Sequence, residues 1–243
     1  MQRGLAFPSL FTKLSPATVL PYARRETRGI HREVEMRRYL LIGAMLVLLA
    51  IPALAFGRAT TTVTVSPNGS FTFGPKTVTK NVGAGAIHWR WSTNGTTAVA
   101  HNVRQDVKLF RSGAPTSHDA NGFDVVPSAG SFHYYCEIHR SFGMQGTIKI
   151  RPQIFNKTAN SFGVRWSTGS RDTGGKFDVR YRVDGGAFKV WKNDVTATQA
   201  TFGAGNAPVQ VAPGHTYDIQ ARSEKASNTS QASDWSPAAR VTT

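Results

Sequence analysis

The most distinctive chemistry in this 243-residue sequence lies in the segment Tyr134–Gly146, which contains the only cysteine of the chain. His139 follows Cys136 by three positions, and Met144 follows His139 by five. A thiolate, an imidazole and a thioether are therefore placed on one short loop. Two histidines, one cysteine and a weak axial methionine are the typical ligands of an electron-transfer copper ion. The sequence thus predicts one mononuclear copper site, which needs a second histidine from elsewhere in the chain.

The second histidine is expected from another strand, and His101 in the run Ala100–Val103 is well placed to supply it. We therefore expect the copper ligands to be His101, Cys136, His139 and Met144. The remaining histidines of the exported part are expected to be structural or solvated: His88, His118, His133 and His215.

Other uses of these side chains fit less well. A lone buried cysteine is usually a small core residue, but that leaves His139 and Met144 unexplained. A catalytic Cys–His pair lacks a third, orienting residue, and methionine is a poor zinc ligand. A dinuclear copper centre needs a second cysteine, and the paired His-x-His of a multicopper oxidase does not occur in the sequence. We therefore expect no enzymatic activity.

The segment 60–150 has the pattern of an all-β module. Short runs alternate apolar and polar residues, and turn signals such as Asn-Gly and Gly-Pro separate them. Expected strands include Thr62–Val65, Thr77–Thr79, Ile87–Trp91, Phe132–Cys136 and Gly146–Ile150. We expect an antiparallel sandwich. Alternation along the fourth of these strands places Phe132, Tyr134 and Cys136 on the inward face, away from water.

The module resembles the plastocyanin and pseudoazurin branch of the cupredoxins, which are type 1 blue copper proteins with a Greek-key β-sandwich. The Cys-x2-His-x4-Met loop of that family is matched by Cys136, His139 and Met144, and its upstream His-Asn-Val by residues 101–103. The approach to the cysteine strand is matched by Gly130–Phe132, and the Gly-Met-x-Gly exit by residues 143–146. Ala100 departs from the family, because plastocyanins often have proline there.

The resemblance also implies roles for residues next to the ligands. Asn102 would tie the two ligand-bearing loops together, which affects metal affinity. His139 would carry electrons at an apolar surface beside Ile138 and Phe142, where a partner docks. Tyr135 would provide a second electron route.

The segment 151–243 repeats the all-β pattern without a cluster of metal ligands. Expected strands are Val164–Ser167, Phe177–Val183, Ala187–Trp191 and Tyr217–Ala221, with a hairpin turn at Asp184–Gly186. This part resembles an immunoglobulin-like fibronectin type III domain, on the residues Trp166, Tyr181, Val211–Tyr217 and Ser233–Pro237. The resemblance implies a spacer or adhesion module that attaches the protein to the cell envelope.

The N-terminus is expected to be a targeting segment that is not part of a folded domain. From Met36, two arginines precede an apolar run that ends in the small-residue pattern Ala53–Ala55. This pattern predicts a secretory signal peptide over 36–59, cleaved after Ala55 or Ala59. An uncleaved anchor helix is the alternative, and only then would the protein contact the membrane. Residues 1–35 are expected to be a non-native or disordered extension, with translation starting at Met36.

The charge of +15 comes from 29 lysines and arginines against 14 acidic residues. These basic residues are spread through every segment, which argues against nucleic acid as a partner and favours acidic redox partners. We therefore expect an extracytoplasmic blue copper protein that transfers single electrons. Copper sequestration or delivery with the same ligands is the main alternative, and an adhesion protein with a purely structural copper-protein fold is another.

Overall fold

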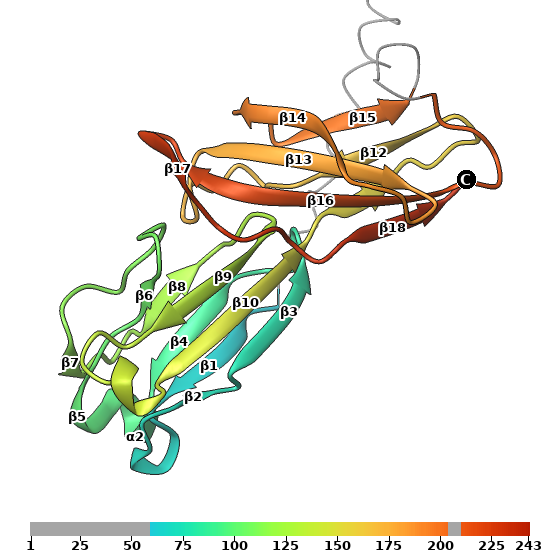
Figure 1. The fold of residues 1–243 in the computed structure, drawn as a ribbon. Helices are drawn as coiled ribbons and strands as arrows, with labels where there is room; N and C mark the ends of the chain where they lie inside the picture. The colour runs from blue at the N-terminus through green and yellow to red at the C-terminus, as the bar shows by residue number, and fades with distance from the viewer. Residues whose placement is uncertain (1–58, 204–209) are drawn as a thin grey trace, which may run out of the picture. The chain divides into compact units, whose positions relative to one another are not determined.

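The computed structural model describes residues 59–203 and 210–243, in which β-strands are the main secondary structure (Figure 1). The predicted signal segment and the extension before it lie outside the described residues, except for Ala59. Across the described ranges, every helix is too short or too polar to cross a membrane.

The first half of the described residues contains two four-stranded sheets. One has the order β2-β1-β4-β8, and the other has the order β3-β10-β9-β6. A short two-stranded ladder, β5-β7, lies at one end. The strands are β1 (Thr61–Val65), β2 (Phe73–Gly74), β3 (Thr77–Asn81), β4 (Ile87–Trp91), β5 (Thr96–His101), β6 (Arg104–Gln105), β7 (Thr116–His118), β8 (Phe123–Val125), β9 (Gly130–Tyr135) and β10 (Gln145–Arg151). The helical turns are η2 (Pro67–Gly69), α2 (Ser92–Gly95) and η3 (Arg140–Phe142).

The pairing of these strands corrects the expectation of an antiparallel sandwich. β1 pairs with β4 in parallel, and β3 pairs with β10 in parallel. The reason is the connection: β3 lies between β1 and β4 in the sequence but belongs to the other sheet. The chain therefore crosses from one sheet to the other before it returns beside β1, which produces parallel neighbours.

The two sheets enclose an aromatic core. Trp89 on β4 contacts Tyr134 on β9 edge-to-face, with ring centroids 5.2 Å apart. Phe132, Tyr134 and Cys136 are fully buried whereas His133 is exposed, which confirms the predicted alternation. β9 ends at Tyr135, so Cys136 is the first residue beyond the strand.

The second half contains a three-stranded sheet of order β11-β12-β15 and a larger sheet of order β14-β13-β16-β17, in which β18 also pairs with β16. Its strands are β11 (Gln153–Phe155), β12 (Ser161–Arg165), β13 (Lys176–Val183), β14 (Lys189–Val195), β15 (Gln199–Gly203), β16 (Thr216–Lys225), β17 (Asn228–Ala232) and β18 (Ala239–Thr242). The predicted hairpin is confirmed, because β13 and β14 are antiparallel and Asp184 and Gly185 both have positive φ. Positive φ at both central residues matches the right-handed twist of the strands.

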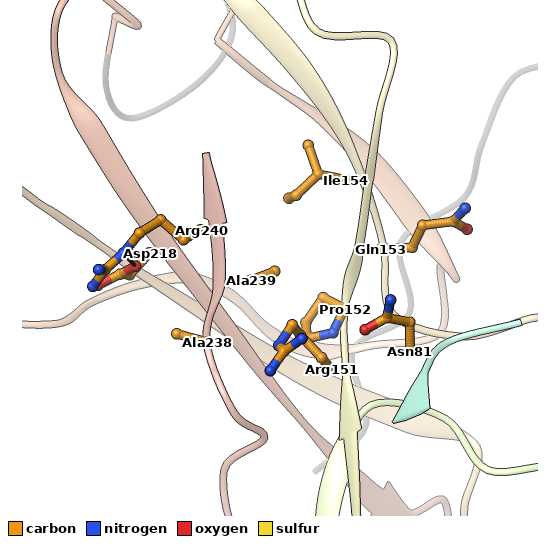
Figure 2. Close-up of a pocket in the computed structure, with 9 residues that line it drawn as sticks. All are labelled: Asn81, Arg151, Pro152, Gln153, Ile154, Asp218, Ala238, Ala239 and Arg240. Atoms are coloured by element: carbon orange, nitrogen blue, oxygen red, sulfur yellow. Dashed lines mark hydrogen bonds and ion pairs between the residues drawn. The ribbon is translucent and has the colours of Figure 1, made fainter. Parts of the chain in front are cut away.

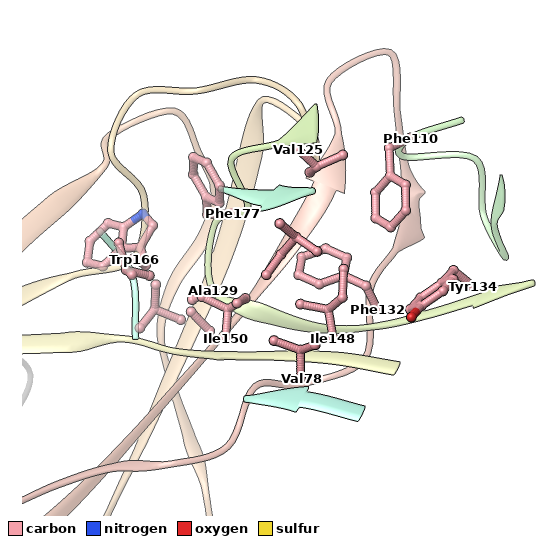
Figure 3. Packing of buried hydrophobic residues seen from close by; sticks show 14 of the residues in the cluster. Val78, Phe110, Val125, Ala129, Phe132, Tyr134, Ile148, Ile150, Trp166 and Phe177 are labelled. Carbon is pink, nitrogen blue, oxygen red and sulfur yellow. The ribbon is translucent and has the colours of Figure 1, made fainter. Parts of the chain in front are cut away.

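The buried side chains of both halves form one contiguous cluster (Figure 3). Trp166 and Phe177 belong to it together with Ala129 and Ile150. Backbone hydrogen bonds accompany this contact: Ala129 donates to the carbonyl of Trp166, and Ser131 exchanges two bonds with Asp234. These bonds hold the beginning of β9, the strand that leads to the predicted ligand loop.

Candidate metal centre

Three of the four predicted ligands come from the loop that joins β9 to β10. Cys136 opens this loop, His139 precedes the η3 turn, and Met144 is its last residue before β10. The Cys136 amide donates to the Met144 carbonyl at 3.1 Å, and the Met144 amide donates to the His139 carbonyl at 3.2 Å. These bonds continue the β9-β10 ladder and close the loop, so that its residues face one another. His101, at the end of β5, approaches from another segment.

His101, Cys136 and His139 form a buried group whose donor atoms converge. The two Nδ1 atoms lie 3.1 Å apart, and Cys136 Sγ lies 3.8 Å from that of His101 and 3.6 Å from that of His139. A circle through the corners of this triangle has a radius of about 2.0 Å, close to a metal–imidazole bond. One ion can therefore contact all three atoms without moving them, and the donor set of two imidazoles and a thiolate fits copper.

The environment of His101 keeps its imidazole available as a ligand. The side chain is completely buried. Burial, and to a lesser degree the neighbouring His139, lower the pKa of His101 from 6.5 to about 4. A neutral imidazole at physiological pH retains the lone pair that a metal ion requires.

Met144 is fully buried and belongs to the same apolar cluster as Cys136. Its backbone hydrogen bonds with Cys136 and His139 place the residue beside the group of three donors. The role of Met144 as the axial ligand remains a prediction that rests on its residue type and its position in the loop.

Asn102 joins the two segments that carry the ligands. Its Oδ1 accepts a hydrogen bond from the Glu137 amide at 2.9 Å, and its Nδ2 donates to the Gly113 carbonyl at 3.0 Å and to the Glu137 carboxylate. His101 and Cys136 are the immediate neighbours of these two residues. The bonds therefore tie together the two segments that carry the predicted ligands, which is the link that the family resemblance implies for Asn102.

The carboxylate of Glu137 is a feature that the sequence did not predict. It pairs with Arg104 and with Arg111, the latter at 2.7 Å. Burial opposes ionisation, but hydrogen bonds from Arg111, Asn102 and Arg104 outweigh it and lower the pKa of Glu137 to about 2. The carboxylate is therefore ionised at neutral pH, and it accepts hydrogen bonds from three residues of the segment after His101. Nothing in the local pattern around Glu137 indicated this, since its partners lie more than twenty residues away.

Phe71 is a second residue that the sequence did not single out. Its ring stacks on the imidazole of His139, with centroids 4.3 Å apart and planes inclined by 9°. His139 is consequently only 7% exposed, whereas Phe142 is 68% exposed and Ile138 is 51% exposed. Phe71, Ile138 and Phe142 together form an apolar patch over His139, which we call the His139 patch.

Tyr135 lies on the opposite side of the strand end. It is buried, and the guanidinium of Arg140 lies over its ring at 4.2 Å from the centroid. A second arginine, Arg104, lies 5.8 Å away. The predicted electron route through Tyr135 would therefore reach the surface beneath two cations.

A wide polar pocket of about 670 Å³ is separate from the metal ligands (Figure 2). Arg151, Asp218 and Arg240 are among its lining residues, and none of the four predicted ligands contributes to it. Asp218 already forms ion pairs with Arg240 and Arg182. The pocket is thus lined by the Asp218–Arg240 ion pair and by the additional guanidinium of Arg151.

Comparison with solved structures returns plastocyanins, amicyanins and pseudoazurins. Plastocyanin from the fern Dryopteris crassirhizoma matches 37% of this chain and 99% of its own length, with 24% identity and a TM-score of 0.32. A pseudoazurin from Hyphomicrobium denitrificans matches 38% of this chain and 75% of its own, with 17% identity and a TM-score of 0.28. No protein-family model and no curated protein matches the sequence.

Proposed function

We propose that this protein is an exported blue copper protein that transfers single electrons between redox partners. The observation that carries the proposal is the buried triangle of His101 Nδ1, His139 Nδ1 and Cys136 Sγ, whose sides of 3.1 to 3.8 Å suit one ion. Met144 would provide the weak axial thioether. The mixed β-sandwich and the position of the ligand loop support a cupredoxin assignment for residues 60–150.

The copper ion, when bound, supplies a centre that alternates between Cu(I) and Cu(II). The contribution of the protein is to hold the ligands still. The thiolate is a soft donor that suits Cu(I), imidazole serves both states, and a fixed cage limits rearrangement between them. Hydrogen bonds between Asn102 and Glu137, and between Arg104 and Glu137, help to hold the ligands still. They join the segment after His101 to the loop that begins at Cys136.

The burial of the ligands favours electron transfer over copper delivery. Handing an ion to another protein by ligand exchange requires an incoming ligand to reach the metal. His101 and Cys136 are completely buried, and Phe71 covers one face of His139. An electron can leave through the edge of the His139 imidazole without any incoming ligand reaching the metal.

The His139 patch is the surface that we propose for docking. Its exposed Phe142 and Ile138 would make apolar contacts. Arg140, on the same loop, and Arg111, which pairs with Glu137 of that loop, are about half exposed and would attract acidic partners. Tyr135 beneath Arg140 would provide the second route. The signal pattern from Met36 supports export to the periplasm, the cell surface or the medium.

We propose that residues 151–243 form a fibronectin type III module that serves as a spacer or an envelope attachment. The hydroxyl of Tyr217, at the start of β16, accepts a hydrogen bond from the Ala212 amide at 3.0 Å. A bond from this position back to the preceding backbone is the tyrosine corner of such sandwiches. The buried Trp166 on the opposite sheet also agrees with the assignment.

Adding Cu(II) to the purified, metal-free protein tests the function. We expect one copper per chain, an intense blue thiolate-to-copper absorption, and a reversible reduction at one potential. Cys136→Ala should abolish the colour, whereas His133→Ala, an exposed histidine on β9, should retain it. A colourless Cu(I) form that exchanges readily and has no redox cycle would instead support sequestration or delivery. Absence of copper binding would overturn both functions.

A further inference from the structure

A second cluster of ligand-type side chains lies in the larger sheet of residues 151–243, far along the chain from the copper ligands. Asp178 on β13, Asp194 on β14 and Glu224 on β16 each offer one carboxylate oxygen, and these oxygens lie within 4.8 Å of one another. The three strands are neighbours in the order β14-β13-β16 (Figure 1). The cluster therefore belongs to a continuous, hydrogen-bonded surface.

A β-bulge brings Asp194 into this cluster. The register between β13 and β14 shifts between Phe177 and Val179, so that an extra residue of β14 faces Asp178. Asp194 adopts a positive φ of 53° there, and its amide donates to Asp178 Oδ1 at 2.9 Å. Its side chain is exposed and receives a hydrogen bond from Asn193. The site would thus be open to solvent on the Asp194 side.

Glu224 provides the observation that points to a ligand. The residue is 1% exposed, and its Oε2 forms no hydrogen bond of normal geometry with any described residue. Its other oxygen lies 3.4 Å from the guanidinium of Arg222, a distant contact. An ionised oxygen that is buried without a partner is costly, and native structures satisfy such atoms with a proton, a water or a cation.

The local charge balance favours a divalent cation. Asp178, Asp194 and Glu224 carry three negative charges when ionised. Arg222, which binds Asp178 Oδ2 at 2.7 and 2.9 Å, is the one cation in contact with them among the described residues. Two negative charges remain uncompensated. Burial, and contact with the Asp178 carboxylate, raise the pKa of Glu224, which reflects the same deficit of positive charge.

We propose that Asp178, Asp194 and Glu224 bind a hard divalent cation, and that this cation is Ca²⁺. Three carboxylate oxygens without sulfur or imidazole are a hard donor set, which suits Ca²⁺ rather than copper. Oxygens separated by up to 4.8 Å can share an ion with bonds of about 2.3–2.6 Å, the range for Ca²⁺. Water would complete the coordination on the Asp194 side. The proposal is independent of copper binding.

Calorimetric titration of the metal-free full chain with CaCl₂ tests the site. We expect one Ca²⁺ per chain, with a dissociation constant of about 10⁻⁴–10⁻³ M as in extracellular calcium modules, and a higher melting temperature with Ca²⁺. Asp194→Asn, which alters an exposed side chain, should weaken binding by about tenfold because it removes one charged ligand. Asp234→Asn, an exposed acid of the same half outside the cluster, should bind Ca²⁺ like the unmodified protein.

Glu224→Gln distinguishes cation binding from a rival explanation, in which Glu224 is protonated and shares its proton with Asp178. If the cation occupies the site, Glu224→Gln should lose the calcium-dependent rise in melting temperature. If the unmodified protein shows no calcium binding at millimolar concentrations, or binds equally well after Asp194→Asn and Glu224→Gln, the proposal is overturned.

Discussion

The ring of Phe71 lies parallel to the imidazole of His139, at 4.3 Å between centroids. Phe71 belongs to the turn between β1 and β2, whereas His139 belongs to the β9–β10 loop. A residue from the first strand pair thus covers the ligand that would exchange electrons with a partner. The stack therefore covers one face of the His139 imidazole.

Phe71→Ala should admit water to His139 while leaving the three donor atoms in place. Water near the site stabilises the more highly charged Cu(II), so we expect a lower reduction potential and faster removal of copper by a chelator. Voltammetry and the rate of colour loss would measure the two effects. Phe142→Ala is the matched control, because that ring lies 6.2 Å from the imidazole and is largely exposed. Equal effects of the two substitutions would contradict a specific role for the stack.

Met144→Leu should preserve the blue absorption and raise the reduction potential. Leucine nearly conserves the buried volume, and such exchanges cost less than about 1.5 kcal/mol. Loss of the thioether removes a weak donor that stabilises Cu(II), and axial ligands tune the potential of blue copper sites. A potential that stays unchanged, with copper bound, would show that Met144 is not a ligand.

Glu137→Gln should lower copper affinity by roughly 10–100-fold, the usual effect of disturbing residues that orient metal ligands. Glutamine at this position cannot form the ion pairs with Arg104 and Arg111, so the segment after His101 is held less firmly. Competition with a copper chelator measures the affinity. Asp106→Asn removes only the more exposed pair with Arg140, at 3.6 Å, and should leave the affinity unaltered.

Asp218→Asn should destabilise the protein by roughly 1.5–3 kcal/mol at neutral pH, the range for hydrogen bonds to charged groups. The carboxylate is buried, and its hydrogen bonds to Arg240 and then Arg182, despite burial, lower its pKa below the ordinary 3.8. A depressed folded pKa adds stability above pH 3.8, and this stability is lost as the pH falls through the folded value. Denaturant unfolding at several pH values should therefore show the variant and the unmodified protein converging in acid. A gap that widens in acid would refute this assignment.

The strands that position the site were largely predictable from the sequence. β1, β3, β4 and β10 follow the alternating runs closely, because one face of each is buried and the other is not. The short strands β6 and β8 were not predicted, since runs of two or three residues carry too little periodicity. The parallel pairs were also missed, because alternation reveals burial and not the direction of the neighbouring strand.

Within the site, the predicted ligands were singled out by their residue types alone. The structure brings together His101, Cys136 and His139, and Asn102 makes the expected link. Phe71 and the arginine partners of Glu137 escaped because phenylalanine and arginine are common on any β-rich surface. Their roles depend on contacts between segments far apart in the chain, which one sequence does not encode in a local pattern.

The Cys136–Met144 loop has a thermodynamic consequence for folding. Its three prospective donors are separated by so few residues that the unfolded chain can still wrap them around an ion. Copper would then bind the denatured ensemble as well as the native state, and only the difference between the two affinities stabilises the fold. That difference would come chiefly from His101, the single donor that a folded β5 must deliver from a distance.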